Sequence, residues 1–302
     1  MSADASSIKS VLYALSANLA IAIAKLVAAL ITGATSMMAE AVHSFADSGN
    51  QVLLLWGMRQ AKRPPSPEHP LGHGKAVYFW SFIVAIMLFS MGGLYSVYEG
   101  WHKLSAPEPI TSPWLAIGVL IFAIVAEGLS LAGCIREVNK ERGDRPFSQW
   151  FRETRTSELL VVFGEDLAAL LGLSFALCAM AVAMVTGNPM YDALGSIAIG
   201  ILLLVIAVMV GAEVKALLIG QGVEPARRQA MLTWLEAQPE VAGVFNMVTL
   251  QLGNDVMVAV KARMAAQPSD TALVEAINAV EDRMQAAFPD IMWLFFEPDL
   301  RD

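Results

Sequence analysis

Residues 39–51 read Ala-Glu-Ala-Val-His-Ser-Phe-Ala-Asp-Ser-Gly-Asn-Gln, so that a histidine and an aspartate lie one helical turn apart in a largely apolar stretch. Positions i and i+4 of a helix lie on one face, so His43 and Asp47 would lie one above the other. An imidazole nitrogen and a carboxylate oxygen held in this way form half of a site for a first-row transition metal. A proton relay without metal is the alternative.

The composition places this stretch in a membrane protein. Of 302 residues, 56% are hydrophobic and only 16% are charged, whereas about 25% of the residues of a soluble domain are charged. A helix needs about 20 apolar residues to cross the hydrocarbon core of a bilayer. Six segments are long enough: residues 10–33, 36–60, 77–100, 112–134, 157–185 and 193–214. We therefore predict an all-α bundle of six transmembrane helices over residues 1–214.

Positive charge is distributed unevenly over the loops between these segments. The second loop and its edge hold Arg59, Lys62, Arg63 and Lys75, and the fourth loop holds Arg136, Lys140, Arg142, Arg145, Arg152 and Arg155. The remaining loops hold only Lys103. Because cytoplasmic loops carry the excess of lysine and arginine, we expect both termini in the cytoplasm and the protein in the inner, cytoplasmic membrane.

The chain changes character after residue 214, where polar and apolar residues begin to alternate. The expected elements are a helix at 224–238, strands at 241–251 and 255–264 joined by a tight turn, a helix at 269–288 capped by Ser269 or Asp270, and a strand at 290–297. This order predicts a small α+β domain of αββαβ type over residues 215–302.

Further ionisable residues occur at membrane depth and are functional candidates, because such residues are costly there. Glu165 and Asp166 are adjacent in the fifth segment, and Glu127 lies in the fourth. Adjacent helical positions diverge by about 100°, so we expect one of the pair, rather than both, to bind metal. Lys25 is expected to snorkel or to pair with Glu40 in a structural role.

Asp192, at the start of the sixth segment, is either a helix-end residue or a functional one. The loop after the second segment carries Glu68, His69 and His73, which either bind a second cation or are simply solvated. Neither histidine nor cysteine occurs in residues 215–302, so a zinc site in that domain is not expected.

These residues, in this order, resemble the cation diffusion facilitator family of metal/proton antiporters over nearly the whole chain. The motifs are HSxxD at residues 43–47, HPxGHGK at 69–75, and a C-terminal αββαβ domain. The resemblance implies a ferredoxin-like, metallochaperone-like cytosolic domain and a homodimer, to which Trp293, Phe295 and Phe296 would contribute. It also implies a transporter rather than an enzyme, with no prosthetic group and no nucleic-acid partner, that exports divalent cations by alternating access in exchange for protons. Zn²⁺ is the first candidate, and Mn²⁺, Fe²⁺, Co²⁺ and Ni²⁺ are alternatives.

The fifth segment departs from the usual family pattern. Most zinc-transporting members carry histidine or aspartate four residues before the aspartate that Asp166 matches, but this chain has Val162 there. The sequence around Glu165 and Asp166 is similar to that of the zinc transporter nine branch of the family. The implied ligands are therefore His43, Asp47 and Asp166, and the fourth position is open to Glu165, to Glu127 or to water. We favour Glu165.

Two further expectations follow from this set of ligands. His43 would be the main proton carrier, because free histidine titrates near a pKa of about 6.5. Ser66 replaces an aspartate that bacterial zinc exporters of the family use in the loop site, so a loop site is less strongly implied. A metal sensor that regulates without transport, and an intramembrane metalloenzyme, remain as alternatives, although the sequence has no HExxH or GxSxG motif.

Overall fold

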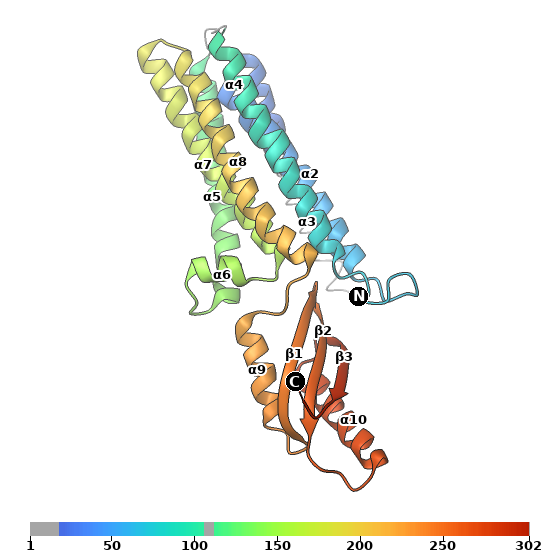
Figure 1. Cartoon of the computed structure of the whole chain (residues 1–302). Helices are drawn as coiled ribbons and strands as arrows, with labels where there is room; N and C mark the ends of the chain where they lie inside the picture. Colours follow the sequence, from blue (N-terminus) through green and yellow to red (C-terminus); the bar gives the residue numbers. More distant parts are fainter. Residues whose placement is uncertain (1–17, 106–111, 302) are drawn as a thin grey trace, which may run out of the picture. The chain divides into compact units, whose positions relative to one another are not determined.

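The computed structural model describes residues 18–105 and 112–301, which form two compact units. The first unit contains residues up to Trp56, Trp80–Arg145 and Glu158–Glu213; the second contains Gly57–Phe79, Pro146–Ser157 and the chain from Val214 onward. The helices before residue 220 are Asn18–Thr32, α2 (Thr35–Ala61), α3 (Ala76–Met87), the π-helix η1 (Leu88–Leu94), α4 (Tyr95–Ser105), α5 (Pro113–Arg142), α6 (Phe147–Glu153), α7 (Ser157–Thr186) and α8 (Met190–Ile219) (Figure 1).

Four helices of the described chain are long and apolar enough to cross a membrane: Ala76–Ser105, which joins α3, η1 and α4, and the helices α5, α7 and α8. Each has 30 residues, which corresponds to a length of about 45 Å and suits a bilayer with its headgroups. They match the last four predicted segments. α2 covers the second predicted segment, whereas residues 10–17 of the first segment lie outside the described residues.

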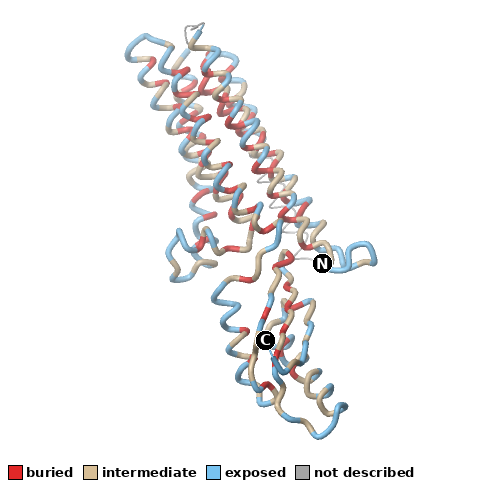
Figure 2. Tube along the Cα trace, viewed as in Figure 1, coloured by how far each residue is buried: buried red, intermediate tan, exposed pale blue. Residues whose placement is uncertain are grey.

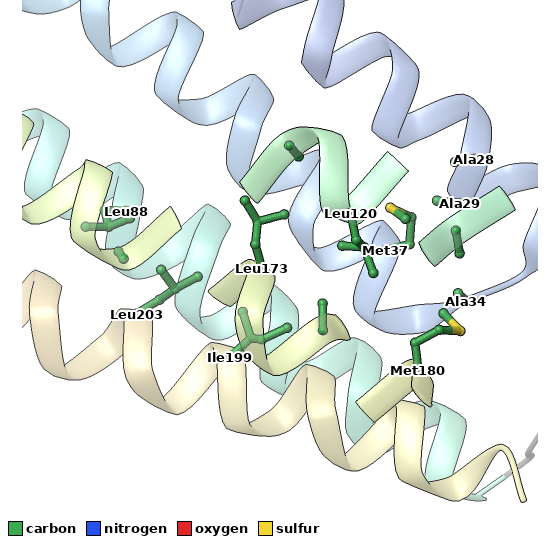
Figure 3. Packing of buried hydrophobic residues seen from close by; sticks show 14 of the residues in the cluster. Ala28, Ala29, Ala34, Met37, Leu88, Leu120, Leu173, Met180, Ile199 and Leu203 are labelled. Atoms are coloured by element: carbon green, nitrogen blue, oxygen red, sulfur yellow. The ribbon is translucent and has the colours of Figure 1, made fainter. Parts of the chain in front are cut away.

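Small side chains bring the helices of the first unit close together. Its core contains Leu88, Leu120, Leu173, Ile199 and Leu203 among several alanines (Figure 3). A Cβ on Gly200 of α8 would lie 2.8 Å from the carbonyl oxygen of Gly93, so these two segments are almost in backbone contact. Buried residues lie on the facing sides of the helices, and exposed residues lie on the outer sides (Figure 2). Small residues at helix interfaces and large apolar ones outside are typical of packing in lipid.

The helices and strands of the second unit after residue 220 confirm the predicted αββαβ order. They are α9 (Pro225–Glu236), β1 (Val241–Leu252), β2 (Asp255–Met264), α10 (Asp270–Ala287) and β3 (Ile291–Pro298). The strand order is β1-β2-β3; β1 and β2 are antiparallel, and β2 and β3 are parallel. The Ser269 side chain accepts a hydrogen bond from the backbone N–H of Ala272, so the predicted cap of α10 is confirmed.

The last strand presents its aromatic residues on two different faces. The contribution of Phe296 to a homodimer stays a prediction, but this side chain packs, partly buried, against the core that includes α9 and α10 and so lies on the other face from Trp293 and Phe295. The reason is the two-residue period of a strand, which turns neighbouring side chains to opposite faces. Trp293 and Phe295 instead stack on each other, with ring centroids 6.4 Å apart.

Within the second unit, the first turn of α3 and the residues just before it contact the tip of the β1–β2 hairpin. The Tyr78 hydroxyl accepts a hydrogen bond from the Gly253 N–H at 3.1 Å and donates one to the Gly253 carbonyl at 3.4 Å. A Cβ on Gly74 would overlap the Leu252 carbonyl oxygen, which belongs to rigid strand backbone. Glycine at position 74 is therefore required for this contact.

Replacement of Gly74 by alanine is expected to lower the apparent unfolding temperature by several degrees. Forcing one methyl group into a filled contact costs about 1–3 kcal/mol, and tryptophan fluorescence during heating in detergent measures the change. Gly118→Ala is the matched control, because a Cβ there meets no atom within 4 Å. Equal unfolding temperatures of the Gly74 variant and the wild type would show that the contact adds nothing to stability.

Candidate metal site

A cavity of about 30 Å³ lies within the first unit, between four helices. Its lining comes from the Asn18–Thr32 helix, α2, α5 and α7, and consists of Asn18, Ser44, Asp47, Gln51, Glu127, Val162, Glu165 and Asp166. A single water occupies roughly 10–15 Å³ on this scale, so the cavity has room for an ion or for one or two waters. Four of its eight lining residues carry carboxylates, which favours a cation as the occupant.

The two adjacent carboxylates of α7 both reach the cavity, each with its own hydrogen-bond donor. Glu165 accepts a hydrogen bond from the Asn50 side-chain amide of α2 at 2.6 Å. Asp166 accepts one from the Ser130 hydroxyl of α5 at 3.1 Å. The structure therefore brings together both residues that sequence reasoning placed about 100° apart. The angle of about 100° between adjacent helical positions thus keeps neither carboxylate away from the cavity, and both stay predicted ligands.

His43 lies beside the cavity but is absent from its lining. It is fully buried, and its Nε2 is 3.5 Å from Oδ2 of Asp47. Neither ring nitrogen has a hydrogen-bond partner among the described residues. A Cβ on Gly92 of η1 would lie 3.5 Å from Nδ1, so the ring faces this π-helix on one side and Asp47 on the other. Single π-helical turns inside α-helices are frequent at functional sites.

Val162 lines the cavity at the position where the family pattern has a ligand. Its side chain offers no donor atom, and Glu127 of α5 lines the same cavity. In the described part of the chain, no three histidine, cysteine, aspartate or glutamate side chains are arranged closely enough to hold a metal ion as they stand. The carboxylates therefore surround a cavity without forming a closed coordination shell.

From the sequence alone, no role was assigned to Ser130. Its position three residues after Glu127 could have marked it as a residue of the site. That spacing puts the two side chains on one face of α5, and one contacts Asp166 while the other lines the cavity.

The loop residues His69 and His73 are brought together, with ring centroids 4.3 Å apart. Nδ1 of His73 is buried and has no hydrogen-bond partner among the described residues. Ser66 accepts a hydrogen bond from the backbone N–H of His69 at 3.2 Å, so its hydroxyl stabilises the turn. Glu68 is exposed. A second cation site at this loop stays a prediction.

Two ionisable residues outside the cavity have structural partners. Asp192 of α8 accepts hydrogen bonds from the backbone N–H groups of Thr35 and Ser36 and from the Ser36 hydroxyl, and so caps the start of α2. The predicted pairing of Lys25 with Glu40 is confirmed, with 3.5 Å between Nζ and Oε2.

Comparison with known proteins gives the chain's relatives. Residues 11–219 match the model of the cation efflux transmembrane domain. The proton-coupled zinc antiporter SLC30A9 (mitochondrial) of Xenopus laevis is 38% identical over 232 residues, which are 76% of this chain and 41% of that protein. The same protein of Homo sapiens is 35% identical with the same coverage. Metal tolerance protein C4 of Arabidopsis thaliana is 32% identical over 70% of this chain and 46% of that protein.

The chain thus spans less than half the length of these relatives. The match of the transmembrane model to most of the chain agrees with the HSxxD and HPxGHGK motifs and with the four long apolar helices. The chain is a multi-pass membrane protein, and it belongs to the cation diffusion facilitator family.

Proposed function

We propose that the chain is a secondary transporter that exports divalent transition-metal cations, Zn²⁺ foremost, in exchange for protons. The observation that carries this proposal is the convergence of Asp47, Glu127, Glu165 and Asp166 on one cavity within the helical bundle. Ionisable residues in membrane spans mark ion pathways. The printed names of the relatives, a proton-coupled zinc antiporter among them, also support it.

The proposed ligands are His43, Asp47 and Asp166, with Glu165 in the fourth position. Imidazole and carboxylate ligands suit Zn²⁺, Mn²⁺, Fe²⁺, Co²⁺ and Ni²⁺, and affinity alone does not select among them. Ligands lose protons when they bind metal, so metal binding on one side and proton binding on the other would drive exchange. Nε2 of His43 is 3.5 Å from Oδ2 of Asp47, which lines the cavity, so a metal bound to Asp47 would lie beside the imidazole.

In this proposal the bundle has six spans, the Asn18–Thr32 helix and α2 being the two beyond the four long apolar helices. Access would alternate through rocking of one group of helices against another. Both termini and the ferredoxin-like domain would lie on the cytoplasmic side of the inner membrane.

We further propose that the protein is a homodimer, to which the exposed face of the sheet contributes. Val248, Ala259 and Phe295 are paired in register across the three strands, and Val248 and Phe295 are 52% and 53% exposed. An apolar row of this kind, free of charge, is typical of an interface core. A C2 dimer would use the same row on both copies.

Phe295→Glu is therefore expected to shift the purified protein from dimer to monomer, as measured by light scattering coupled to size exclusion. Val274→Glu on α10 is the matched control, since Val274 is 55% exposed but lies on a helix. A wild-type protein of monomer mass, or dissociation by both variants alike, would contradict this interface.

The proposed activity is tested with the purified protein in liposomes that hold a zinc-sensitive dye. We expect zinc entry that grows with an imposed proton gradient, accompanied by proton movement in the opposite direction. Metal-dependent conformational change without zinc flux would favour a sensor instead, and release of a hydrolysis product would favour an enzyme. Absence of zinc flux in either direction would overturn the proposal.

A further inference from the structure

The first helix contributes a buried ammonium group next to the candidate metal site. Lys25 and Glu40 are both 0% exposed, and Nζ lies 3.5 Å from Oε2 of Glu40. The same ammonium donates a hydrogen bond to the hydroxyl of Ser44 at 2.6 Å. Lys25 is the only lysine or arginine that is buried in the described ranges, 18–105 and 112–301.

This ammonium contacts the wall of the cavity through Ser44. Glu40, Ser44 and Asp47 follow one another at spacings of four and three residues, which places them on one face of α2. Ser44 and Asp47 line the cavity, so the residue that Lys25 contacts directly is part of its wall. Charges interact strongly where water is excluded, and a cation in the cavity would therefore experience the positive charge of Lys25.

Glu40 depends on this partner, because α7 closes the space around its carboxylate. A Cβ on Gly172 would overlap Oε1 of Glu40, and that oxygen has no hydrogen-bond partner among the described residues. One carboxylate oxygen thus faces Lys25 and the other is buried without a donor. Removing one member of a buried pair leaves an uncompensated charge, which is far less favourable than removing both.

We propose that Lys25 is a built-in counter-cation that neutralises Glu40, keeps this carboxylate out of the metal's ligands and so sets how tightly a divalent cation binds. The inference rests on the proposed transport function. A site that transports must bind its ion firmly enough to take it up and weakly enough to release it. By neutralising Glu40, Lys25 prevents a fifth negative charge from adding to the four carboxylates of the cavity, which shifts that balance toward release.

The two members of the pair should act in opposite directions on metal affinity. Without Lys25, Glu40 becomes an additional negative charge beside the cavity, so a divalent cation binds more tightly and leaves more slowly. Without Glu40, the ammonium remains unpaired beside the cavity and repels the cation. Removal of both restores the balance of charge. Lys25 is thus a positioning residue, because it acts through Glu40 and Ser44 and not as a ligand.

The test compares Lys25→Met, Glu40→Gln and the double variant with the wild type in zinc-uptake assays on proteoliposomes. We expect KM for zinc to fall about tenfold with a lower maximal rate in Lys25→Met, to rise about tenfold in Glu40→Gln, and to return to within about threefold of the wild type in the double variant. Glu213→Gln removes a carboxylate from α8 that does not line the cavity and should leave KM unchanged.

A purely structural role predicts a different pattern. Both single variants would then lose folded protein on size exclusion, KM would not move in opposite directions, and the double variant would be no better than the single ones; this pattern would overturn the inference. If Lys25→Met does not fold, recovery of KM from Glu40→Gln to the double variant decides the question. A wild type without zinc uptake would refute the transport proposal itself, whereas a transporting wild type with unmoved KM values would refute only the role of Lys25.

Discussion

Replacement of Asp47 by alanine is expected to lower zinc-for-proton exchange by about a hundredfold or more. Asp47 lines the cavity, and its Oδ2 lies 3.5 Å from Nε2 of His43. Mutation of residues that merely orient metal ligands costs about 10–100-fold in affinity or activity. Loss of a proposed ligand that contributes charge should cost at least as much.

The matched control for this variant is Ser48→Ala. Ser48 follows Asp47 directly on α2 and is buried, but its hydroxyl donates to the Ser44 carbonyl within the same helix and it does not line the cavity. Rates are measured in the same proteoliposomes, after the amount of folded protein in each has been matched. An Asp47→Ala protein that keeps more than a tenth of the wild-type rate would remove Asp47 from the ligand set.

Much of the fold could be predicted from the sequence because its signals are local. The length of the apolar segments predicted the long helices, and alternation with turn residues predicted the αββαβ order. The predicted hairpin turn at residues 253–255 is one residue shorter in the structure, where it lies between Leu252 and Asp255. The same alternation could have placed Phe296 in the core, since it is adjacent to Phe295 in a strand.

The candidate site was only partly predictable, because its geometry depends on how separate helices pack. The carboxylates were identified as candidate site residues because charged residues are rare at membrane depth. The sequence does not tell whether Glu165 and Asp166 reach one cavity, because this depends on the side chains of Asn50 and Ser130 from two other helices. The burial of His43 against η1 likewise depends on a π-helical turn that the sequence marks only by its adjacent glycines, Gly92 and Gly93.

The identity of the fourth metal ligand can be tested by the zinc affinity of variants at Glu165 and Glu127. Glu165→Gln is expected to raise the zinc dissociation constant about 10–100-fold, whereas Glu127→Gln should change it only a few-fold. Glu165 is held on the cavity wall by the Asn50 amide at 2.6 Å. A carboxylate that is already oriented loses less rotational freedom on binding a metal. Isothermal titration of zinc into the purified protein measures affinity separately from flux.

Val162 provides an internal check on this assignment. Because Val162 lines the cavity one helical turn before Asp166, an aspartate placed there would restore the ligand that the family pattern has at this position. Glu165→Gln combined with Val162→Asp should therefore regain most of the lost affinity, while Val162→Asn, which matches the size without the charge, should not. If Glu165→Gln binds zinc like the wild type while Glu127→Gln abolishes binding, then α5, and not the carboxylate beside Asp166, supplies the missing ligand.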